Sequence, residues 1–169
     1  MKNLTLTICL ILAVLLQQGC TTLEQSYRHG ADFQKGLAAA QSGDFATALR
    51  EWKPLAEQGD ADAQFFLGVM YRKGEGVPQD DKTAVKWWTL AAEQGYALAQ
   101  YNLGVMYRYG EGVLQDYVYA HMWFDITASN GDEDGGELRD AVAKEMTATQ
   151  IAEAEKLAQE CVRKEYKGC

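Results

Sequence analysis

Leu67-Gly68-Val69-Met70-Tyr71-Arg72 recurs without change as Leu103-Gly104-Val105-Met106-Tyr107-Arg108, 36 residues further along the chain. A second block, Gly74-Glu75-Gly76-Val77, recurs as Gly110-Glu111-Gly112-Val113 at the same interval. A fixed period of this length is typical of stacked supersecondary units, because each unit alone cannot bury its apolar face. Such arrays present an extended surface to other molecules, so the repeat favours a binding role over a catalytic one.

The repeated unit resembles the Sel-one-like repeat family, a relative of the tetratricopeptide repeats. The first copy matches the family's spacing of small, apolar and aromatic residues at Ala63, Leu67, Gly68, Tyr71, Gly74, Gly76, Val77, Asp80, Ala84 and Trp87. The second copy matches it at Ala99, Leu103, Gly104, Tyr107, Gly110, Gly112, Val113, Asp116, Ala120 and Trp123. The resemblance implies an all-α fold, a right-handed α-solenoid of about four antiparallel helix pairs, in which these residues are structural repeat positions.

Shorter and weaker matches lie on both sides of the two copies. Upstream, six residues resemble a tetratricopeptide-type hairpin without the glycine-rich insert: Gly36, Gly43, Asp44, Phe45, Ala48 and Trp52. Downstream of Gly131 the pattern fades into segments that resemble the closing helices of the family. The expected organisation is a lipoprotein signal peptide at 1–19, a tether at 20–30, a tetratricopeptide-like helix pair at 31–60, Sel-one-like repeats at 61–96 and 97–132, and capping helices with a tail at 133–169.

Apolar residues at helical spacing, together with turn residues, divide the chain into paired helices. The expected helices cover residues 31–41, 44–58, 61–73, 81–94, 97–109, 116–130, 133–145 and 148–162. Asp44 is expected to be an N-cap, and Thr147 and Gln150 have the spacing of a capping box. Gly68 and Gly104 fall inside helices, where glycine costs up to ~1 kcal/mol relative to alanine. Because this cost recurs at one register, we expect another helix to approach closely there.

The first twenty residues have the features of an export signal. Lys2 precedes an apolar stretch over residues 4–16, which is too short to span a bilayer comfortably. Gly19-Cys20 then resembles a bacterial lipoprotein processing site, with Gln17 where the usual pattern has leucine. The resemblance implies that Cys20 is acylated, and Thr21 after it favours the inner leaflet of the outer membrane. The alternative is plain secretion, with cleavage close to the same position.

Two cysteines remain near the C-terminus once Cys9 leaves with the signal and Cys20 carries the lipid. In an oxidising compartment, the leftover pair of Cys161 and Cys169 favours a disulfide, and Gly168 would let the tail turn back. The same spacing recurs in cysteine-rich members of the resembled family, where it links paired helices. Two free thiols are the alternative.

The charge balance of the chain is acidic, with 16 Lys and Arg residues against 24 Asp and Glu residues and a formal net charge of −8. Nucleic-acid binding requires clustered lysine and arginine, so this balance disfavours nucleic acid as a partner. It also disfavours electrostatic binding to anionic lipid. Membrane attachment is therefore expected to depend on the acylated Cys20.

Candidate catalytic and metal-binding residues are few. The two histidines are His29 and His121, and no second histidine or cysteine lies at ligand spacing from His121. Asn130-x-Asp132-x-Asp134-Gly135 copies the start of an EF-hand loop, but Ala141 stands where calcium needs a bidentate glutamate. An acidic turn between helices is the better interpretation. We expect no catalytic residue, no metal site and no cofactor.

The inward-facing register of tetratricopeptide repeats, carried over onto the first helix of each pair, implies a partner-binding groove. Its residues are Phe33, Phe65, Val69, Arg72, Tyr101, Val105, Arg108 and Tyr109. Aromatic residues and arginines are the types that anchor protein interfaces. Two alternatives remain: an ordinary amphipathic surface, and arginines that pair with Glu75 or Glu111.

The sequence as a whole supports a non-catalytic adaptor or scaffold that binds another envelope protein or peptide. The expected location is periplasm-facing and lipid-anchored in the outer membrane, or otherwise secreted or periplasmic. Some members of the resembled family suggest an alternative, a cell-wall-linked hydrolase of the β-lactamase type or a polysaccharide-export factor. No Ser-x-x-Lys motif supports β-lactam chemistry here. A third interpretation is an architectural subunit of an envelope complex.

Overall fold

The computed structural model describes residues 30–169, and the predicted signal peptide at 1–19 and the predicted lipidation site Cys20 lie outside the described residues. Within that range the chain forms helices and turns and contains no strand. A first helix covers residues 30–41, and the others are α2 (Phe45–Glu57), α3 (Ala61–Lys73), α4 (Asp81–Ala92), α5 (Ala97–Tyr109), α6 (Tyr117–Ser129), α7 (Glu133–Ala143) and α8 (Ala148–Arg163). The prediction of an all-α solenoid of about four helix pairs is confirmed.

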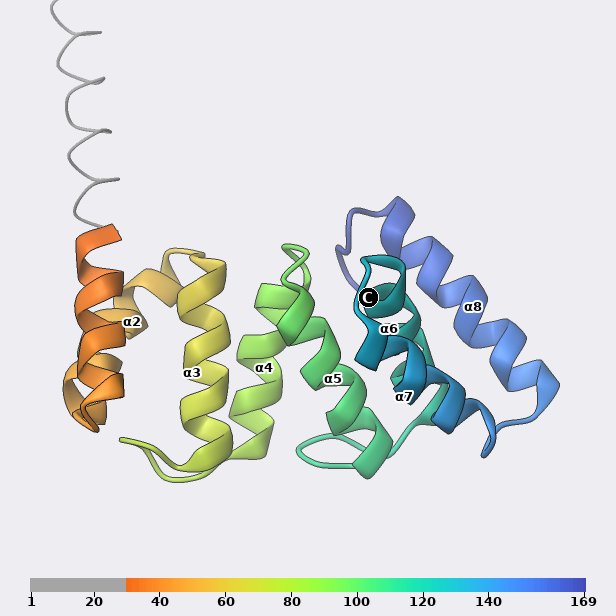
Figure 1. Ribbon diagram of the computed structural model, residues 1–169, viewed down its shortest axis with the longest axis horizontal. Coiled ribbons are helices and arrows are strands. Elements are labelled where there is room, and N and C mark those ends of the chain that lie inside the picture. The colour runs from red at the N-terminus through yellow and green to blue at the C-terminus, as the bar shows by residue number, and fades with distance from the viewer. Residues whose placement is uncertain (1–29) are drawn as a thin grey trace, which may run out of the picture.

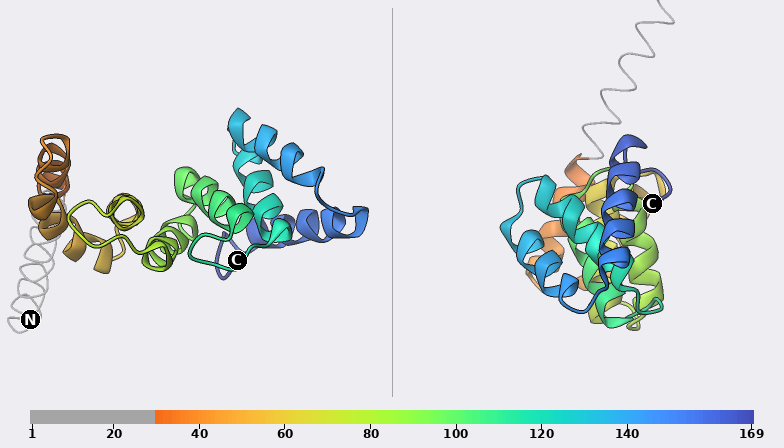
Figure 2. Two further views of the ribbon diagram at one scale, coloured as in Figure 1. Left: turned by 90° about the horizontal axis from the view of Figure 1, so that it is seen from below. Right: turned by 90° about the vertical axis from the view of Figure 1, so that its right-hand side faces the viewer.

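The helices stack along one long axis in the order of the chain (Figure 1). Each helix contacts the next along the stack from α2 to α7, and α8 returns to pack against α6. Seen from below, the first helices of the pairs lie on one side of the stack, and the second helices lie on the other (Figure 2, left). The first helices are the helix over 30–41, α3, α5 and α7, and the second helices include α2, α4 and α6. The stack curves toward the side of these first helices, which is therefore its concave side.

Acidic side chains and glycines define the ends of the helices. The carboxylate of Asp44 accepts a hydrogen bond from the amide of Thr47 (3.0 Å), as expected for an N-cap. Gly74 and Gly110 end α3 and α5 in the left-handed conformation, with φ of 72° and 69°. The predicted capping box at the start of α8 is present. These local signals fix where each helix turns back.

The two glycines inside helices mark the closest helix contacts. A Cβ atom on Gly68 would collide with the indole ring of Trp88, and one on Gly104 would lie 2.6 Å from the ring of Phe124. Trp88 also donates a hydrogen bond from Nε1 to the carbonyl of Phe65 (3.2 Å). The expected close approach of another helix at this register is confirmed. The rings that cover the glycines belong to the residues directly after the tryptophans of the repeat pattern, Trp87 and Trp123.

The remaining repeat positions fill the apolar interior between and within the pairs. Nearly all of them are buried or pack against the buried clusters. The fully buried members are Ala63, Leu67, Ala84, Ala99, Leu103, Ala120 and Trp123, and the partly buried members that pack against them are Tyr71, Val77, Trp87, Tyr107 and Val113. Because each cluster combines residues of neighbouring pairs, no pair has a complete core by itself.

Each glycine-rich loop connects the two helices of one repeat and packs against the preceding pair. Gly76 and Gly112 both have positive φ, 74° and 70°. A Cβ atom on Gly76 would lie 2.8 Å from Cβ of Phe45, at the start of α2. A Cβ atom on Gly112 would meet the backbone carbonyl of Asp81, at the start of α4. Each loop therefore lies directly on the second helix of the preceding pair, and glycine is required for both the conformation and the space.

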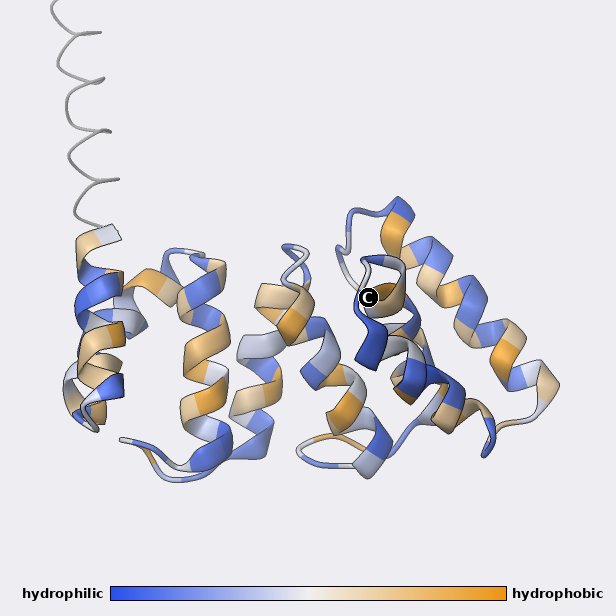
Figure 3. Ribbon diagram, viewed as in Figure 1, coloured by the Kyte–Doolittle hydropathy of each residue, from blue (hydrophilic) through white to orange (hydrophobic). Residues whose placement is uncertain are grey.

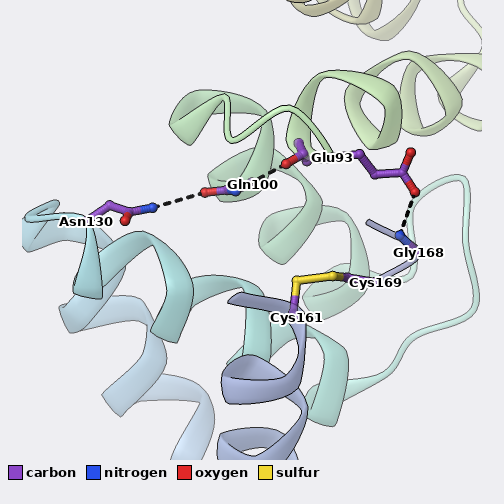
Figure 4. Close-up of a disulfide and its surroundings, with 7 residues drawn as sticks. Glu93, Gln100, Asn130, Cys161, Gly168 and Cys169 are labelled. Atoms are coloured by element: carbon purple, nitrogen blue, oxygen red, sulfur yellow. Dashed lines mark hydrogen bonds between the residues drawn. A yellow bond between two sulfur atoms is a disulfide. The ribbon is translucent and has the colours of Figure 1, made fainter. Parts of the chain in front are cut away.

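Two buried glutamines connect neighbouring pairs through hydrogen bonds. Gln64 donates to a backbone carbonyl near the end of α2 (3.0 Å) and accepts from the side chain of Gln94 (2.8 Å). One repeat later, Gln100 donates to the carbonyl of Ala92 (3.2 Å) and accepts from Asn130 (3.4 Å; Figure 4). Buried amides need such partners, so the two glutamines help to set the register of the stack.

The tail after α8 folds back onto the turn between α4 and α5. Cys161 and Cys169 form a disulfide, with their Cα atoms 5.5 Å apart (Figure 4). The amide of Gly168 donates to the carboxylate of Glu93 (3.0 Å), and the ring of Tyr166 lies against Gly95. The C-terminus thus caps the interior between α4, α5 and α6.

Apolar and polar residues alternate along the helices of the stack (Figure 3). Among residues 30–169, no helix is long and apolar enough to cross a membrane.

Candidate interaction groove

A hollow on the concave side lies between α3 and α5, the first helices of the two repeats. Its volume is about 220 Å³. It is lined by Val69, Arg72, Lys73, Trp88, Asn102, Val105 and Met106. The structure therefore brings together Val69, Arg72 and Val105 from the predicted groove. We refer to these seven residues as the α3–α5 groove. Lys73, Trp88, Asn102 and Met106 were not predicted as groove residues.

Three of the four aromatic residues predicted for the groove, Phe33, Phe65 and Tyr101, are half-buried between helices. Phe33 lies against Trp52, with ring centroids 6.0 Å apart. Phe65 stacks on Tyr96 at 5.0 Å, and Tyr101 meets Phe124 edge-on at 5.9 Å. Much of each ring is therefore occupied by packing within the solenoid. A partner that binds the concave side could contact only the exposed part of each ring.

Tyr96 is held at the start of α5 by its surroundings. Burial, followed by a hydrogen bond to the carboxylate of Asp62, raises the pKa of Tyr96 to about 12. Tyrosine is protonated at neutral pH, so the phenol of Tyr96 faces the Asp62 carboxylate as a hydrogen-bond donor. This fixes the ring on which Phe65 stacks, beside the α3–α5 groove.

Arg72 connects the two repeats. Its guanidinium lies 3.2 Å from the carboxylate of Asp81 and 2.6 Å from that of Glu111, in the loop of the next repeat. Pairing with Glu111 was one alternative left open by the sequence, and it is confirmed. Glu75 instead lies 3.9 Å from Lys73. Because both of its hydrogen-bonding edges are occupied, Arg72 positions the loop of the next repeat.

Arg108 occupies the equivalent place one repeat later but has different neighbours. The register that puts Asp81 and Glu111 beside Arg72 puts Tyr117 and Thr147 at the corresponding positions. Within residues 30–169, no carboxylate lies within ion-pairing distance of Arg108, and its guanidinium carbon sits 5.4 Å from the ring centroid of Tyr109. Tyr109 is 61% exposed. Arg108 and Tyr109 therefore present a cation and an aromatic ring at the edge of the concave side.

A second hollow, of about 430 Å³, lies between α6 and α8. It is lined by Asp125, Ile126, Ser129, Ala158, Gln159, Val162 and Arg163. Asp125 is engaged by Arg139 at 3.2 Å, and Val162 is 47% exposed. This surface lies between the second repeat and the closing helix α8, and it contains none of the predicted groove residues.

The other candidate sites take structural roles. His121 is 3% exposed, and its Nδ1 atom has no hydrogen-bond partner among the described residues. Burial is the main reason that the pKa of His121 is lowered, so the ring is neutral at neutral pH. Asp132, from the EF-hand-like segment, caps α7 by accepting from the amide of Gly135 (2.8 Å). In the part of the chain that the structure describes, no three His, Cys, Asp or Glu residues gather as metal ligands.

Comparison with known families agrees with this geometry. The family model of the Sel1 repeat matches residues 61–96 and 97–132, the two units whose sequences recur. The chain is a Sel1-repeat protein. Sel1 repeats generally mediate protein–protein interactions, and the family is typically a non-catalytic scaffold. Comparison of the chain with curated proteins finds no match.

Two solved Sel1-repeat structures share the fold. A protective antigen present in uropathogenic Escherichia coli strains, described as displaying an SLR fold, superposes with a TM-score of 0.77 at 35% identity. The match covers 82% of this chain and 30% of that one. A Sel1 repeat protein from Oxalobacter formigenes superposes with a TM-score of 0.63 at 26% identity, over 76% of this chain and 55% of that one. The chain thus spans less than a third of the first relative and about half of the second.

Proposed function

We propose that this Sel1-repeat protein is a non-catalytic adaptor that binds another envelope protein or peptide through its concave side. The observation that carries the proposal is the α3–α5 groove, a hollow between equivalent helices of two repeats with apolar walls and a polar rim. Interfaces gain most of their energy from a few apolar or aromatic anchors that enter such hollows. The groove lies on the side toward which the stack curves, where an extended segment can touch several repeats at once (Figure 2).

Arg108 and Tyr109 are the charged and aromatic contacts that we assign to the edge of this surface. Arg72 is already paired with two carboxylates, whereas Arg108 has none within ion-pairing distance among the described residues. A guanidinium can bind a carboxylate of a partner through two parallel hydrogen bonds. The acidic character of the chain makes this unpaired cation a specific feature of its concave side.

Replacing Arg108 with alanine is expected to weaken partner binding. Loss of one good interface anchor costs ~2 kcal/mol or more, roughly thirtyfold in affinity. Affinity capture from solubilised native envelope, quantified by mass spectrometry, should show partners that are retained by the wild type and lost with Arg108→Ala. Leu90→Ala is the matched control, because Leu90 is 43% exposed and lies on α4, the second helix of its pair, away from the concave side. If both variants lose the captured partners equally, or if neither loses them, Arg108 does not belong to the recognition surface.

We further propose that the protein faces the periplasm and is attached to the outer membrane by acylated Cys20. The lipoprotein-like Gly19-Cys20 sequence supports the anchor, and the Cys161–Cys169 disulfide fits an oxidising compartment. The anchor would hold the solenoid at the membrane, since the chain carries a net charge of −8 and would not adhere to anionic lipid by itself.

Metabolic labelling tests the anchor directly. A palmitate analogue should label the wild-type protein, and Cys20→Ala should remove the label and release the protein into the soluble periplasmic fraction. Cys161→Ala is the control and should retain the label. A wild-type protein that is unlabelled and soluble would support plain secretion instead.

A further inference from the structure

Side chains of successive first helices come together at three equivalent places along the stack. They join the helix over 30–41 to α3, α3 to α5, and α5 to α7. At the same register of the incoming helix, 36 residues apart, stand Phe66, Asn102 and Leu138. The middle position is thus a polar residue in an otherwise apolar series.

The apolar members of the series fill the contact in which they lie. The ring of Phe66 stacks on Trp52, with centroids 4.9 Å apart and an angle of 27°, and lies 5.8 Å from Phe33. Leu138 packs with the buried cluster that contains Phe124. Trp52, Trp88 and Phe124 are themselves equivalent, because each covers a glycine inside a first helix.

Asn102 leaves the middle contact open. The hollow of about 220 Å³ lies beside Asn102, at the place that Phe66 takes in the preceding contact, and Trp88, which is 4% exposed, forms part of its wall. A cavity of about 150 Å³ already holds a benzene ring. Among residues 30–169, the side-chain amide of Asn102 makes no hydrogen bond. The site therefore combines an aromatic wall, room for one ring and a free amide.

We propose that this hollow receives one aromatic side chain, of the size of phenylalanine, from an extended segment of the partner protein. The ring would take the place beside Trp88 that Phe66 takes beside Trp52. An amide can both donate to and accept from a peptide backbone, so Asn102 would hold the main chain of the same segment. This inference depends on the proposed adaptor function and names the chemistry that its groove recognises.

Binding of short blocked peptides to the purified protein tests the proposal. The probes are acetyl-Ala-X-Ala-amide peptides with phenylalanine, leucine or alanine at X, followed by NMR of the indole and side-chain amide signals. The phenylalanine peptide should bind more than tenfold more tightly than the alanine peptide and shift the signals of Trp88 and Asn102. Asn102→Phe should abolish this binding while raising the melting temperature, because the new ring fills the hollow. Asn102→Leu, which mimics Leu138, should act in the same direction.

Each alternative result has a defined meaning. Equal binding of the three peptides, or shifts near Val162 in the α6–α8 hollow, would overturn the proposal. Unchanged peptide binding by Asn102→Leu would also overturn it, even if Asn102→Phe failed to fold. If envelope partners depend on Arg108 but the phenylalanine peptide does not bind, the adaptor function stands and the aromatic pocket is wrong. If partner capture does not depend on Arg108 and the phenylalanine peptide does not bind, the adaptor function itself is contradicted.

Discussion

Replacing Gly112 with alanine is expected to destabilise the protein by about 2–5 kcal/mol. A methyl group there would meet the backbone of Asp81 and lie 2.9 Å from the backbone nitrogen of Lys82. Neither atom belongs to a side chain that could rotate away, and φ of 70° adds its own strain for any residue with a Cβ atom. Urea denaturation followed by circular dichroism should show the loss as a lower transition midpoint.

Gly131→Ala is the matched control for this prediction. Gly131 also has positive φ, at 93°, but no atom lies within 4 Å of its Cβ position. The free energy of unfolding of Gly131→Ala should therefore fall only by the strain of the backbone conformation, about 1–3 kcal/mol. If the two variants unfold at the same urea concentration, the contact between the loop and α4 does not contribute to stability, and the proposed stacking of repeats is wrong at that point.

Replacing Gly68 with alanine is expected to cost about 1–3 kcal/mol, although alanine is the better helix former. The added methyl group would displace the indole ring of Trp88 and disturb its hydrogen bond to the carbonyl of Phe65. Gly136→Ala is the control, since its Cβ atom would lie at an ordinary distance of 3.8 Å from Ala128. That variant should be stabilised by up to ~1 kcal/mol. Melting shifts of the same sign in both proteins would refute the close helix contact.

The fold could be predicted from sequence because its determinants are local and repeated. α3 and α5 cover the predicted residues, since a glycine in the left-handed conformation ends each of them. α4 ends at Ala92, two residues before the predicted end, where no glycine follows directly. The glycines inside helices also predicted a close contact, because a destabilising residue at one register of two copies requires a structural reason.

The details of the groove could not be predicted because they depend on how the repeats stack. Arg72 and Arg108 end identical six-residue runs. Their surroundings differ because Asp81 and Glu111 flank Arg72, whereas Tyr109 lies against Arg108. The half-burial of Phe65 likewise arises between pairs, where its ring stacks on Tyr96 at the start of α5. Asn102 could have been found by comparing residues at the 36-residue interval, where it stands between Phe66 and Leu138.

These differences assign separate roles to the two arginines. Arg72 holds a loop of the next repeat, so its removal would loosen the stack as well as any interface. A salt bridge this exposed contributes at most ~1 kcal/mol. Arg108 lies beside an exposed tyrosine and is available to a partner. A binding defect in Arg108→Ala would consequently be easier to interpret than one in Arg72→Ala.

Site-specific photo-crosslinking in the native envelope tests whether the protein binds its partner through its concave side. Azidophenylalanine replaces Tyr109 at the edge of the concave side, Leu90 on α4, or Val162 beside the α6–α8 hollow. All three positions are exposed, at 61%, 43% and 47%. We predict a discrete crosslinked partner from position 109 that is absent from positions 90 and 162. The same partner captured from position 90 or 162, with none from position 109, would contradict recognition through the concave side.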